Sequence, residues 1–259
     1  WMSGLTYSMN KNKIESLADN VINPITGQLF SIPSLDMGGY ADLRFILREG
    51  GSMGDLYSRT DLRRDANGAI YMDESNNVYT QKIDNPDSYI KLGSVLPKGN
   101  LAWRNNFMWK NFHVGFMISA RLGGVVFSRT QAILDKFGVS EASADARDNG
   151  FVLINGNDRV NPENWYTTVG STAVPQYYTY SATNVRLQEA SIGYTIPRKW
   201  LANVCDIKVS LIGRNLWMIY NEAPFDPEAV ASTDNFYQGI DNFMMPSLRN
   251  VGFSLNFKF

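Results

Sequence analysis

The sequence predicts an all-β protein whose strands form part of the wall of an antiparallel transmembrane β-barrel. Three observations support this prediction. The last strand alternates apolar and polar residues up to a terminal aromatic, the strands of a central hairpin are long, and short turns alternate with long loops. Membrane-crossing strands are longer than most strands of soluble proteins, and they place an apolar side chain at every second position.

The N-terminal part of the chain contributes two predicted strands. The first occupies residues 1–9, where the odd positions are mostly apolar or aromatic. Asn and Lys at residues 10–13 indicate a turn, and residues 13–17 are expected to form a short return strand. Residues 41–48 largely alternate apolar residues with Asp and Arg, which predicts another strand that ends at the turn 50–51.

A hairpin is predicted in the middle of the chain. Leu, Trp and Phe recur on one face of residues 101–109, and Phe, Val, Ile and Ala recur on one face of residues 112–122. A tight turn at Lys110-Asn111 joins the two strands. The opposite face is small or polar, which suits the hydrated interior of a barrel. Charged residues expected to line that interior are Arg104, Arg121, Lys208 and Arg214.

The next predicted strand, residues 185–196, contains an irregularity. Its apolar phase changes between Leu187 and Ala190. One extra residue in a strand shifts the phase in this way, so a β-bulge is expected near Gln188-Glu189.

Two strands follow toward the C-terminus. Apolar and polar residues alternate over residues 207–220 and again from residue 250 to the end. A closing strand that ends on an aromatic is what a transmembrane barrel needs, because aromatic rings anchor strands at the membrane interface. The apolar and aromatic face of this strand includes Phe253, Leu255, Phe257 and Phe259.

Short and long connections alternate along the chain, as they do in outer-membrane barrels. The short turns are expected at 10–13, 50–51, 110–111 and 197–205, and the long, polar loops at 20–40, 58–100, 124–182 and 221–246. All long loops then lie at one end. If they are extracellular, the last strand runs toward the periplasm and ends at the periplasmic rim.

Composition excludes several classes of function. The chain has 259 residues, a net charge of −1 and no basic run, which argues against nucleic-acid binding. The single Cys205 cannot form an internal disulfide, and the single His113 allows no His-pair metal site or catalytic triad. We therefore expect no enzyme activity, no cofactor and no metal, and a structural role for His113.

The acidic loop residues do not form a recognisable calcium site. No twelve-residue pattern with a central Gly and a closing Glu is present, and a turn-forming role is expected for Asp226 and Glu228. The other acidic residues expected to be solvated are Asp61, Asp65, Asp73 and Glu74. No window of the sequence is long and apolar enough for a transmembrane helix. No signal peptide precedes Trp1, so the chain is expected to be mature or to begin partway through a longer polypeptide.

Several segments, in the same order along the chain, resemble motifs of the SusC/RagA-type TonB-dependent transporters. Residues 185–197, VRLQEASIGYTIP, resemble the RLxxxSLGYTLP strand of that family, and Gly213-Arg214-Asn215-Leu216 resembles its GxNL strand. The remaining similar segments are NKNKI at 10–14, residues 112–124, the Asp-Pro-Glu loop at 225–228 and the closing strand at 246–259.

The resemblance implies more than the residue pattern does. Members of this family form plugged barrels of about 22 strands in the outer membrane of Bacteroidetes. They import glycans, peptides or other nutrients, are driven by the TonB complex, and are capped by a SusD-like surface lipoprotein. This chain has no plug domain and no TonB box. The resemblance therefore implies that residues 1–259 are the C-terminal segment of such a transporter, whose N-terminal remainder supplies the plug. It also implies that the barrel-assembly machinery reads the closing strand, so the candidate assembly signal consists of Phe253, Leu255, Phe257 and Phe259.

One group of aromatic residues is a candidate for contact with the substrate or the lid protein. Aromatic rings in a polar extracellular loop stack on sugars and peptide side chains, although they also pack within their own loop. The candidates are Trp165, Tyr166, Tyr177, Tyr178 and Tyr180.

The alternative function is a soluble or surface-attached β-rich binding module with the aromatic loops as its ligand face. A barrel wall requires detergent for extraction, and such a module does not.

Overall fold

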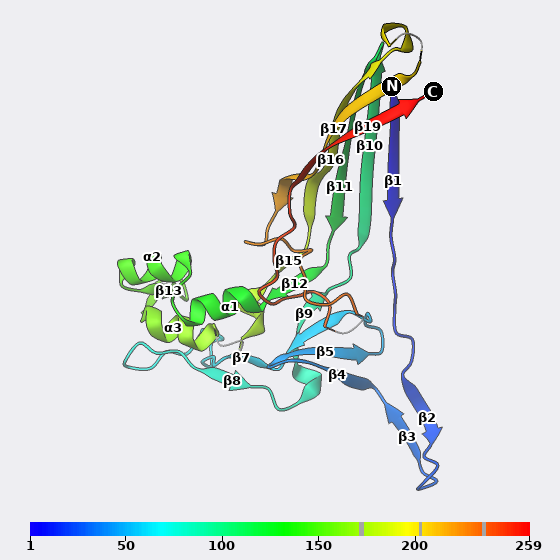
Figure 1. The fold of residues 1–259 in the computed structure, drawn as a ribbon. Helices are drawn as coiled ribbons and strands as arrows, with labels where there is room; N and C mark the ends of the chain where they lie inside the picture. The colour runs from blue at the N-terminus through cyan, green and yellow to red at the C-terminus, as the bar shows by residue number, and fades with distance from the viewer. Residues whose placement is uncertain (171–173, 202–203, 235–236) are drawn as a thin grey trace.

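The computed structural model describes residues 1–170, 174–201, 204–234 and 237–259. Strands dominate, and they form two regions (Figure 1). One region is a long sheet, here called the wall. The other, here called the body, is built from the connections between wall strands and lies at one end of the wall. Both termini lie near the opposite end.

The wall is a six-stranded antiparallel sheet. Its order is β1-β10-β11-β16-β17-β19, which follows the sequence order of these strands. The strands are β1 (Met2–Ser8), β10 (Gly99–Trp109), β11 (Phe112–Leu122), β16 (Asn184–Ile196), β17 (Asp206–Asn221) and β19 (Asn250–Lys258). The structure thus confirms the predicted first strand, central hairpin and closing strand. The sheet is open, because β1 and β19 do not pair with each other.

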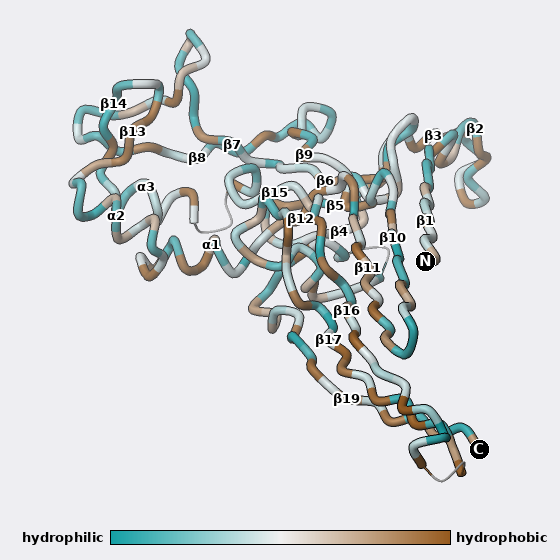
Figure 2. Tube along the Cα trace, turned by 90° about the horizontal axis from the view of Figure 1, so that it is seen from above, coloured by the Kyte–Doolittle hydropathy of each residue, from teal (hydrophilic) through white to brown (hydrophobic). Residues whose placement is uncertain are grey.

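The two faces of the wall differ in chemistry. In the strand register, Phe107, Val114, Ile192, Leu211 and Phe253 form one row across five strands. Figure 2 shows hydrophobic and hydrophilic positions following one another along these strands. Among the paired positions of the described strands, none on this apolar face is Asp, Glu, Lys or Arg. The opposite, polar face carries all charged residues of the wall.

Aromatic side chains flank the apolar face at both ends. The row nearest the β10–β11 turn contains Trp109, Phe112 and Tyr194, with ring centroids 6.3 Å and 4.9 Å apart in successive pairs. Near the body, Trp103 and Trp217 occupy the corresponding positions. Two aromatic girdles around an apolar band are the arrangement found in transmembrane barrels.

The predicted bulge is present in β16. Met117 pairs with Glu189 and Ile118 pairs with Leu187, so no residue of β11 stands opposite Gln188 in the strand register. The pairing with β17 shifts at the same place. This extra residue returns the apolar side chains to one face on both sides of the bulge.

The body contains the hydrophobic core of the chain. Its larger sheets are β4-β5-β6-β9 and β15-β12-β18, and it also holds three short strand pairs. The strands of the two larger sheets are β4 (Ser34–Tyr40), β5 (Leu43–Arg48), β6 (Asp55–Ser58), β9 (Ile90–Ser94), β15 (Thr179–Ser181), β12 (Val125–Ser128) and β18 (Ile240–Asp241). The three pairs are β2 (Ala18–Ile22) with β3 (Leu29–Ile32), β7 (Thr60–Leu62) with β8 (Thr80–Lys82), and β13 (Val152–Ile154) with β14 (Asp158–Val160).

Three α-helices cover part of this core: α1 (Arg129–Lys136), α2 (Glu141–Asn149) and α3 (Pro162–Val169). Each begins at a side chain that accepts hydrogen bonds from the first turn, namely Ser128, Ser140 and Asn161. No helix in the described part of the chain combines the length and the apolar character needed to cross a membrane.

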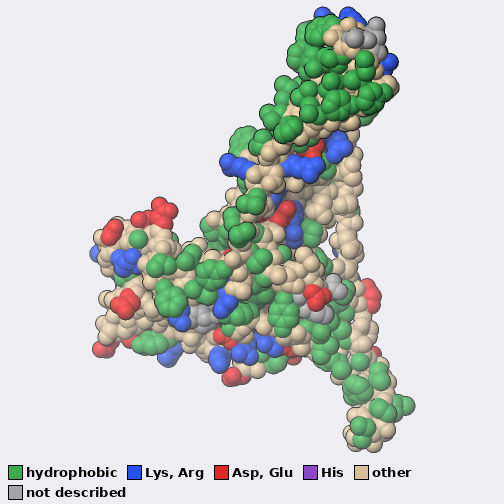
Figure 3. Space-filling model, viewed as in Figure 1, with side chains coloured by type: hydrophobic (Ala, Val, Ile, Leu, Met, Phe, Trp, Pro, Cys, Tyr) green, Lys and Arg blue, Asp and Glu red, His purple; other side chains and the backbone are tan. Residues whose placement is uncertain are grey.

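The wall itself lacks a core. Every residue of the main buried cluster lies in the body, including Phe45, Phe127 and Tyr178. On the wall, Phe253 is 77% exposed, and no second layer of the described structure covers the apolar face. In a soluble sandwich a second sheet would pack there. Figure 3 shows hydrophobic side chains covering much of the visible surface of the wall toward its free end.

One predicted hairpin is wrong. Residues 10–13 form no tight turn and 13–17 form no strand, and β1 pairs instead with β10. The segment is held by the loop after β5: Ile14 N donates to Gly51 O at 2.9 Å, Ile14 O accepts from Gly50 N at 2.8 Å, and Asn12 Oδ1 accepts from the Ser52 hydroxyl. Both backbone groups of Ile14 are therefore paired without a return strand.

The predicted strand at 41–48 exists, but it belongs to the body. It is β5, which lies between β4 and β6, and its Leu43, Phe45 and Ile46 side chains are all buried. A strand buried on both faces cannot line a hydrated lumen.

The predicted loop at 58–100 is also structured, because it contributes β7, β8 and β9 to the body.

The alternation of connection lengths holds within the wall. The β10–β11 and β16–β17 connections are short and lie at the free end, whereas residues 9–98, 123–183 and 222–249 make the body at the other end. Parts of the predicted connections, residues 171–173, 202–203 and 235–236, lie outside the described residues.

Candidate functional site

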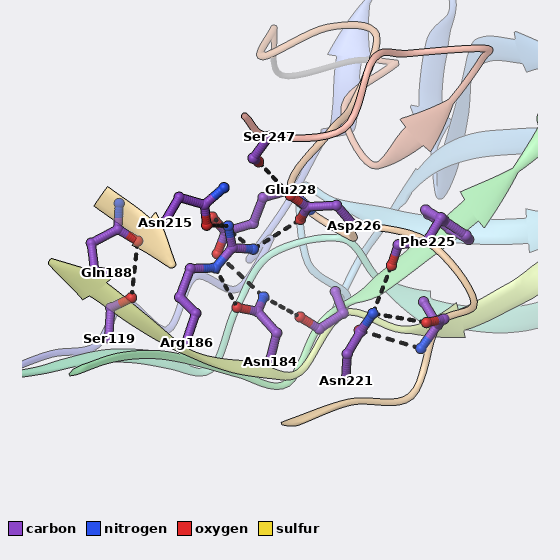
Figure 4. A network of polar contacts seen from close by, with 12 residues as sticks. Ser119, Asn184, Arg186, Gln188, Asn215, Asn221, Phe225, Asp226, Glu228 and Ser247 are labelled. Carbon is purple, nitrogen blue, oxygen red and sulfur yellow. Dashed lines mark hydrogen bonds and ion pairs between the residues drawn. The ribbon is translucent and has the colours of Figure 1, made fainter. Parts of the chain in front are cut away.

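A buried cluster of polar side chains joins the polar face of the wall to the connection between β17 and β19 (Figure 4). Its centre is Arg186 on β16, which is 3% exposed. The Arg186 Nη2 atom lies 2.8 Å from Asp226 Oδ1 and 3.4 Å from Glu228 Oε2. One guanidinium therefore holds both carboxylates of the Asp-Pro-Glu segment.

Amide side chains complete this cluster. Arg186 Nε donates to Asn184 Oδ1 at 3.2 Å, and its Nη1 donates to Asn215 Oδ1 at 3.3 Å. Asn184 Nδ2 in turn donates to Glu228 Oε1 at 3.2 Å, and the Ser247 hydroxyl donates to Asp226 Oδ2. The cluster thus ties β16, β17 and both ends of the 222–249 connection together.

The charge of Asp226 is stabilised within the cluster. Burial favours the neutral carboxyl, but hydrogen bonds from Arg186 and Ser247 outweigh burial and hold the pKa of Asp226 below its usual value. A depressed folded-state pKa means that this ionised group stabilises the fold above the pKa of the unfolded chain. That contribution is lost as the pH falls through the folded-state pKa. Asp226 therefore stays ionised at neutral pH.

Two of the five candidate aromatics belong to the core of the body. Trp165 and Tyr178 are buried, and the Tyr178 hydroxyl donates to Asp135 Oδ2 at 2.9 Å. Packing within the core accounts for these two aromatic side chains, and no ligand is needed to explain them.

The other three candidate aromatics are more accessible. Tyr177 is 37% exposed and lies edge-on to Trp165, Tyr166 donates to Ala142 O, and Tyr180 lies edge-on to Phe225. Burial, together with the nearby Asp135, raises the pKa of Tyr180 to about 12, so its hydroxyl remains protonated. Contact of any of the five with a substrate or lid protein stays a prediction.

Three other residues singled out from the sequence, His113, Asp65 and Asp73, have local structural contacts. His113 Nε2 lies 2.9 Å from Thr195 Oγ1 on the polar face. Asp65 and Asp73 accept backbone N–H groups within their own turns. Among the residues that the structure describes, no three His, Cys, Asp or Glu side chains are grouped so that they could hold a metal ion.

The residues of the predicted assembly signal are accessible on the closing strand. Phe253, Leu255, Phe257 and Phe259 are all exposed, and the first three alternate onto the apolar face. Recognition of this strand by assembly machinery stays a prediction.

Comparison with known proteins agrees with this architecture. No family model matches the chain. The TonB-dependent receptor P3 of Formosa agariphila is 25% identical over 288 residues, an alignment that covers 100% of this chain and 27% of the relative. Two structures of RagAB are similar to the whole chain. The RagAB peptide transporter gives a TM-score of 0.57 at 15% identity, covering 99% of this chain and 27% of the matched chain. The RagAB peptide importer in the open-open state gives a TM-score of 0.57 at 16% identity, covering 99% and 26%.

In sequence, the chain is similar to one segment of a TonB-dependent receptor, and in fold it is similar to one segment of the RagAB transporter. It spans about a quarter of the length of these relatives. The comparisons confirm the resemblance to SusC/RagA-type transporters and the predicted class of fold. The relatives are described as a receptor and as transporters, and none of them as an enzyme.

The Arg186 cluster is the feature that the sequence did not reveal. Asp226 and Glu228 were predicted to form a turn, but nothing in the sequence paired them with Arg186. A signal was present: Arg186 lies in the VRLQEASIGYTIP segment and Asp226 lies in the Asp-Pro-Glu segment, so both resembled family motifs.

Proposed function

We propose that the chain forms part of the wall and the extracellular loops of a TonB-dependent importer in the outer membrane. One observation carries this proposal: the apolar face of the wall has no charged residue and no covering layer, and aromatic rows bound it at both ends. Burying such a face in lipid is favourable, whereas exposing it to water is not. A soluble binding module would need a second layer over this face.

Further strands are proposed to complete the barrel. Each outer strand of the wall, β1 and β19, has one pairing partner among the described strands. An unpaired backbone group in lipid costs several kcal/mol, so membrane barrels are closed. We place residues 1–259 in the C-terminal part of the transporter. The N-terminal remainder would supply the other strands and the plug that contacts the TonB complex.

The proposed substrates are nutrients such as peptides or glycans. The body then lies at the extracellular mouth, where its exposed aromatics can contact the nutrient or a SusD-like surface lipoprotein. The description of the structural neighbours as peptide transporters supports this assignment.

Uptake by cells tests the proposal. Cells that lack the intact transporter should lose uptake of at least one class among labelled oligopeptides and oligosaccharides, and the intact gene should restore it. The transporter should be extracted from the cell envelope only with detergent. Recovery of the protein in the soluble fraction would favour the binding module instead.

Deleting Phe259 should lower the amount of transporter in the outer membrane several-fold. The Phe259 ring is exposed and makes no ring contact in the described structure, so its loss removes little folding energy. A decrease would therefore report on insertion or interfacial anchoring. Outer-membrane levels are measured by quantitative immunoblot, with Phe137→Asp in the body as the exposed aromatic control. Unchanged levels after the deletion would show that the terminal aromatic is not part of an assembly signal.

A further inference from the structure

A cleft of about 710 Å³ lies where the body meets the wall. One side is formed by all five residues of β9, Ile90–Ser94, and the other by all three residues of β15, Thr179–Ser181. Lys98 and Thr183 also line the cleft, and they directly precede β10 and β16. The cleft therefore sits on the rim of the wall.

The cleft is bordered by two strand edges. β9 is the last strand of its sheet and pairs only with β6, while β15 is the last strand of its sheet and pairs only with β12. Successive side chains of a strand point to opposite faces, so a cavity that touches every residue of a strand runs along its edge. Edge strands leave alternate backbone N–H and C=O groups unpaired.

We propose that this cleft binds a short extended peptide, which pairs through its backbone with β9, β15 or both and points a carboxylate at Lys98. The spacings between strands and between sheets give about 160 Å³ for each extended residue. The cleft then holds about four residues, a length that matches the three residues of β15 and the five of β9. The inference rests on the proposed function only in placing the cleft at the mouth of an importer.

Polar side chains in the cleft fit the same ligand. Lys98 is exposed, and no carboxylate among the described residues forms an ion pair with it. Lys91 differs, because its ammonium is 2.5 Å from the buried Asp55 carboxylate. Lys98 is therefore the free cation of the cleft, and it suits a C-terminal or side-chain carboxylate.

The backbone of the two strand edges fits the same ligand. Rows of backbone donors and acceptors along both sides favour a peptide over a glycan, because an extended peptide presents the same alternating groups.

Binding to the intact, detergent-purified transporter tests the proposal. The probe is a fluorescent tetrapeptide of β-branched residues with a free C-terminus, used in anisotropy titrations. We expect saturable binding, and we expect N-methylation of its two internal amides to weaken binding at least tenfold. Lys98→Gln should weaken binding of the free acid about tenfold and leave the C-terminally amidated peptide unchanged. Lys110→Gln, in the turn at the far end of the wall, should change neither.

Three results would overturn the proposal. They are absence of peptide binding, equal binding of the N-methylated peptide, and tighter binding of a linear tetrasaccharide that competes with the peptide. The first two use only the unaltered protein, so they remain informative if Lys98→Gln fails to fold. Detergent-dependent extraction in the same preparation reports on the proposed function separately. A transporter that inserts into the membrane but binds no peptide would contradict this inference alone.

Discussion

Arg186→Met should destabilise the intact transporter by about 3–5 kcal/mol, the cost of removing one partner from a buried ion pair. The substitution leaves Asp226, which is largely buried, without its cation, and Asn184 and Asn215 without a donor. Because the cluster joins β16 to the 222–249 connection, that connection should also detach from the wall. Urea unfolding of the purified transporter measures the stability, and limited proteolysis within residues 222–249 measures the detachment.

A neighbouring arginine provides the matched control. Arg214 on β17 lies 3.3 Å from Glu189 and is also on the polar face, but its side chain is 67% exposed. Exposed ion pairs contribute about 0–1 kcal/mol, so Arg214→Met should have little effect. The double variant Arg186→Met with Asp226→Leu should recover part of the lost stability, because it leaves fewer unpaired charges. Similar losses for Arg186→Met and Arg214→Met would refute the structural role of the cluster.

Leu211→Arg should cost about 2–4 kcal/mol, because it places a charge on the lipid-facing side of the wall. Leu211 lies between Ile192 and Phe253, one row farther from the β10–β11 turn than the aromatic row of Trp109, Phe112 and Tyr194. Leu255→Arg should cost less, because Leu255 lies one row nearer the turns, beside Val209, and the penalty falls toward the interface. Stability of the refolded transporter in lipid vesicles provides the measurement.

The adjacent residues on the polar face provide the controls for these substitutions. Ser210→Arg should be tolerated, since an arginine there points into a hydrated interior. Asn256→Arg should also be tolerated, with a cost of at most about 1 kcal/mol from the cross-strand neighbour Lys208. Equal damage from Leu211→Arg and Ser210→Arg would show that the two faces have been assigned the wrong way round.

The wall could be predicted from the sequence because the alternation of apolar and polar residues is visible within each single strand. A strand with one face in lipid repeats every second residue, and even the extra residue Gln188 is visible as a change of phase between Leu187 and Ala190. From β10 to β19 the wall strands pair in their sequence order, as neighbours in a barrel wall do, but neither the return strand predicted at 13–17 nor the strand at 41–48 stands between β1 and β10.

The body could not be predicted because the residues of its core are spread over connections that lie far apart in the sequence. Its core joins Val95, Phe127 and Ile240, which come from three different connections of the wall. Apart from the strand at 41–48, these connections show no sustained period in the sequence, so they resembled loops. The same reason hid the Arg186 cluster, where Asp226 meets Arg186 only after the 222–249 connection folds back on the wall.

Labelling of introduced cysteines in whole cells tests the orientation most directly. The native Cys205 is first replaced by Ser, and single cysteines are introduced at Val139 or Tyr177 in the body and at Trp200 in the β16–β17 connection. These positions are exposed, Tyr177 at 37% and Trp200 at 65%. A membrane-impermeant maleimide should label positions 139 and 177 in intact cells, and position 200 only after the outer membrane is breached. Labelling of position 200 in intact cells, with positions 139 and 177 protected until breach, would contradict a wall that crosses the outer membrane with its body outside.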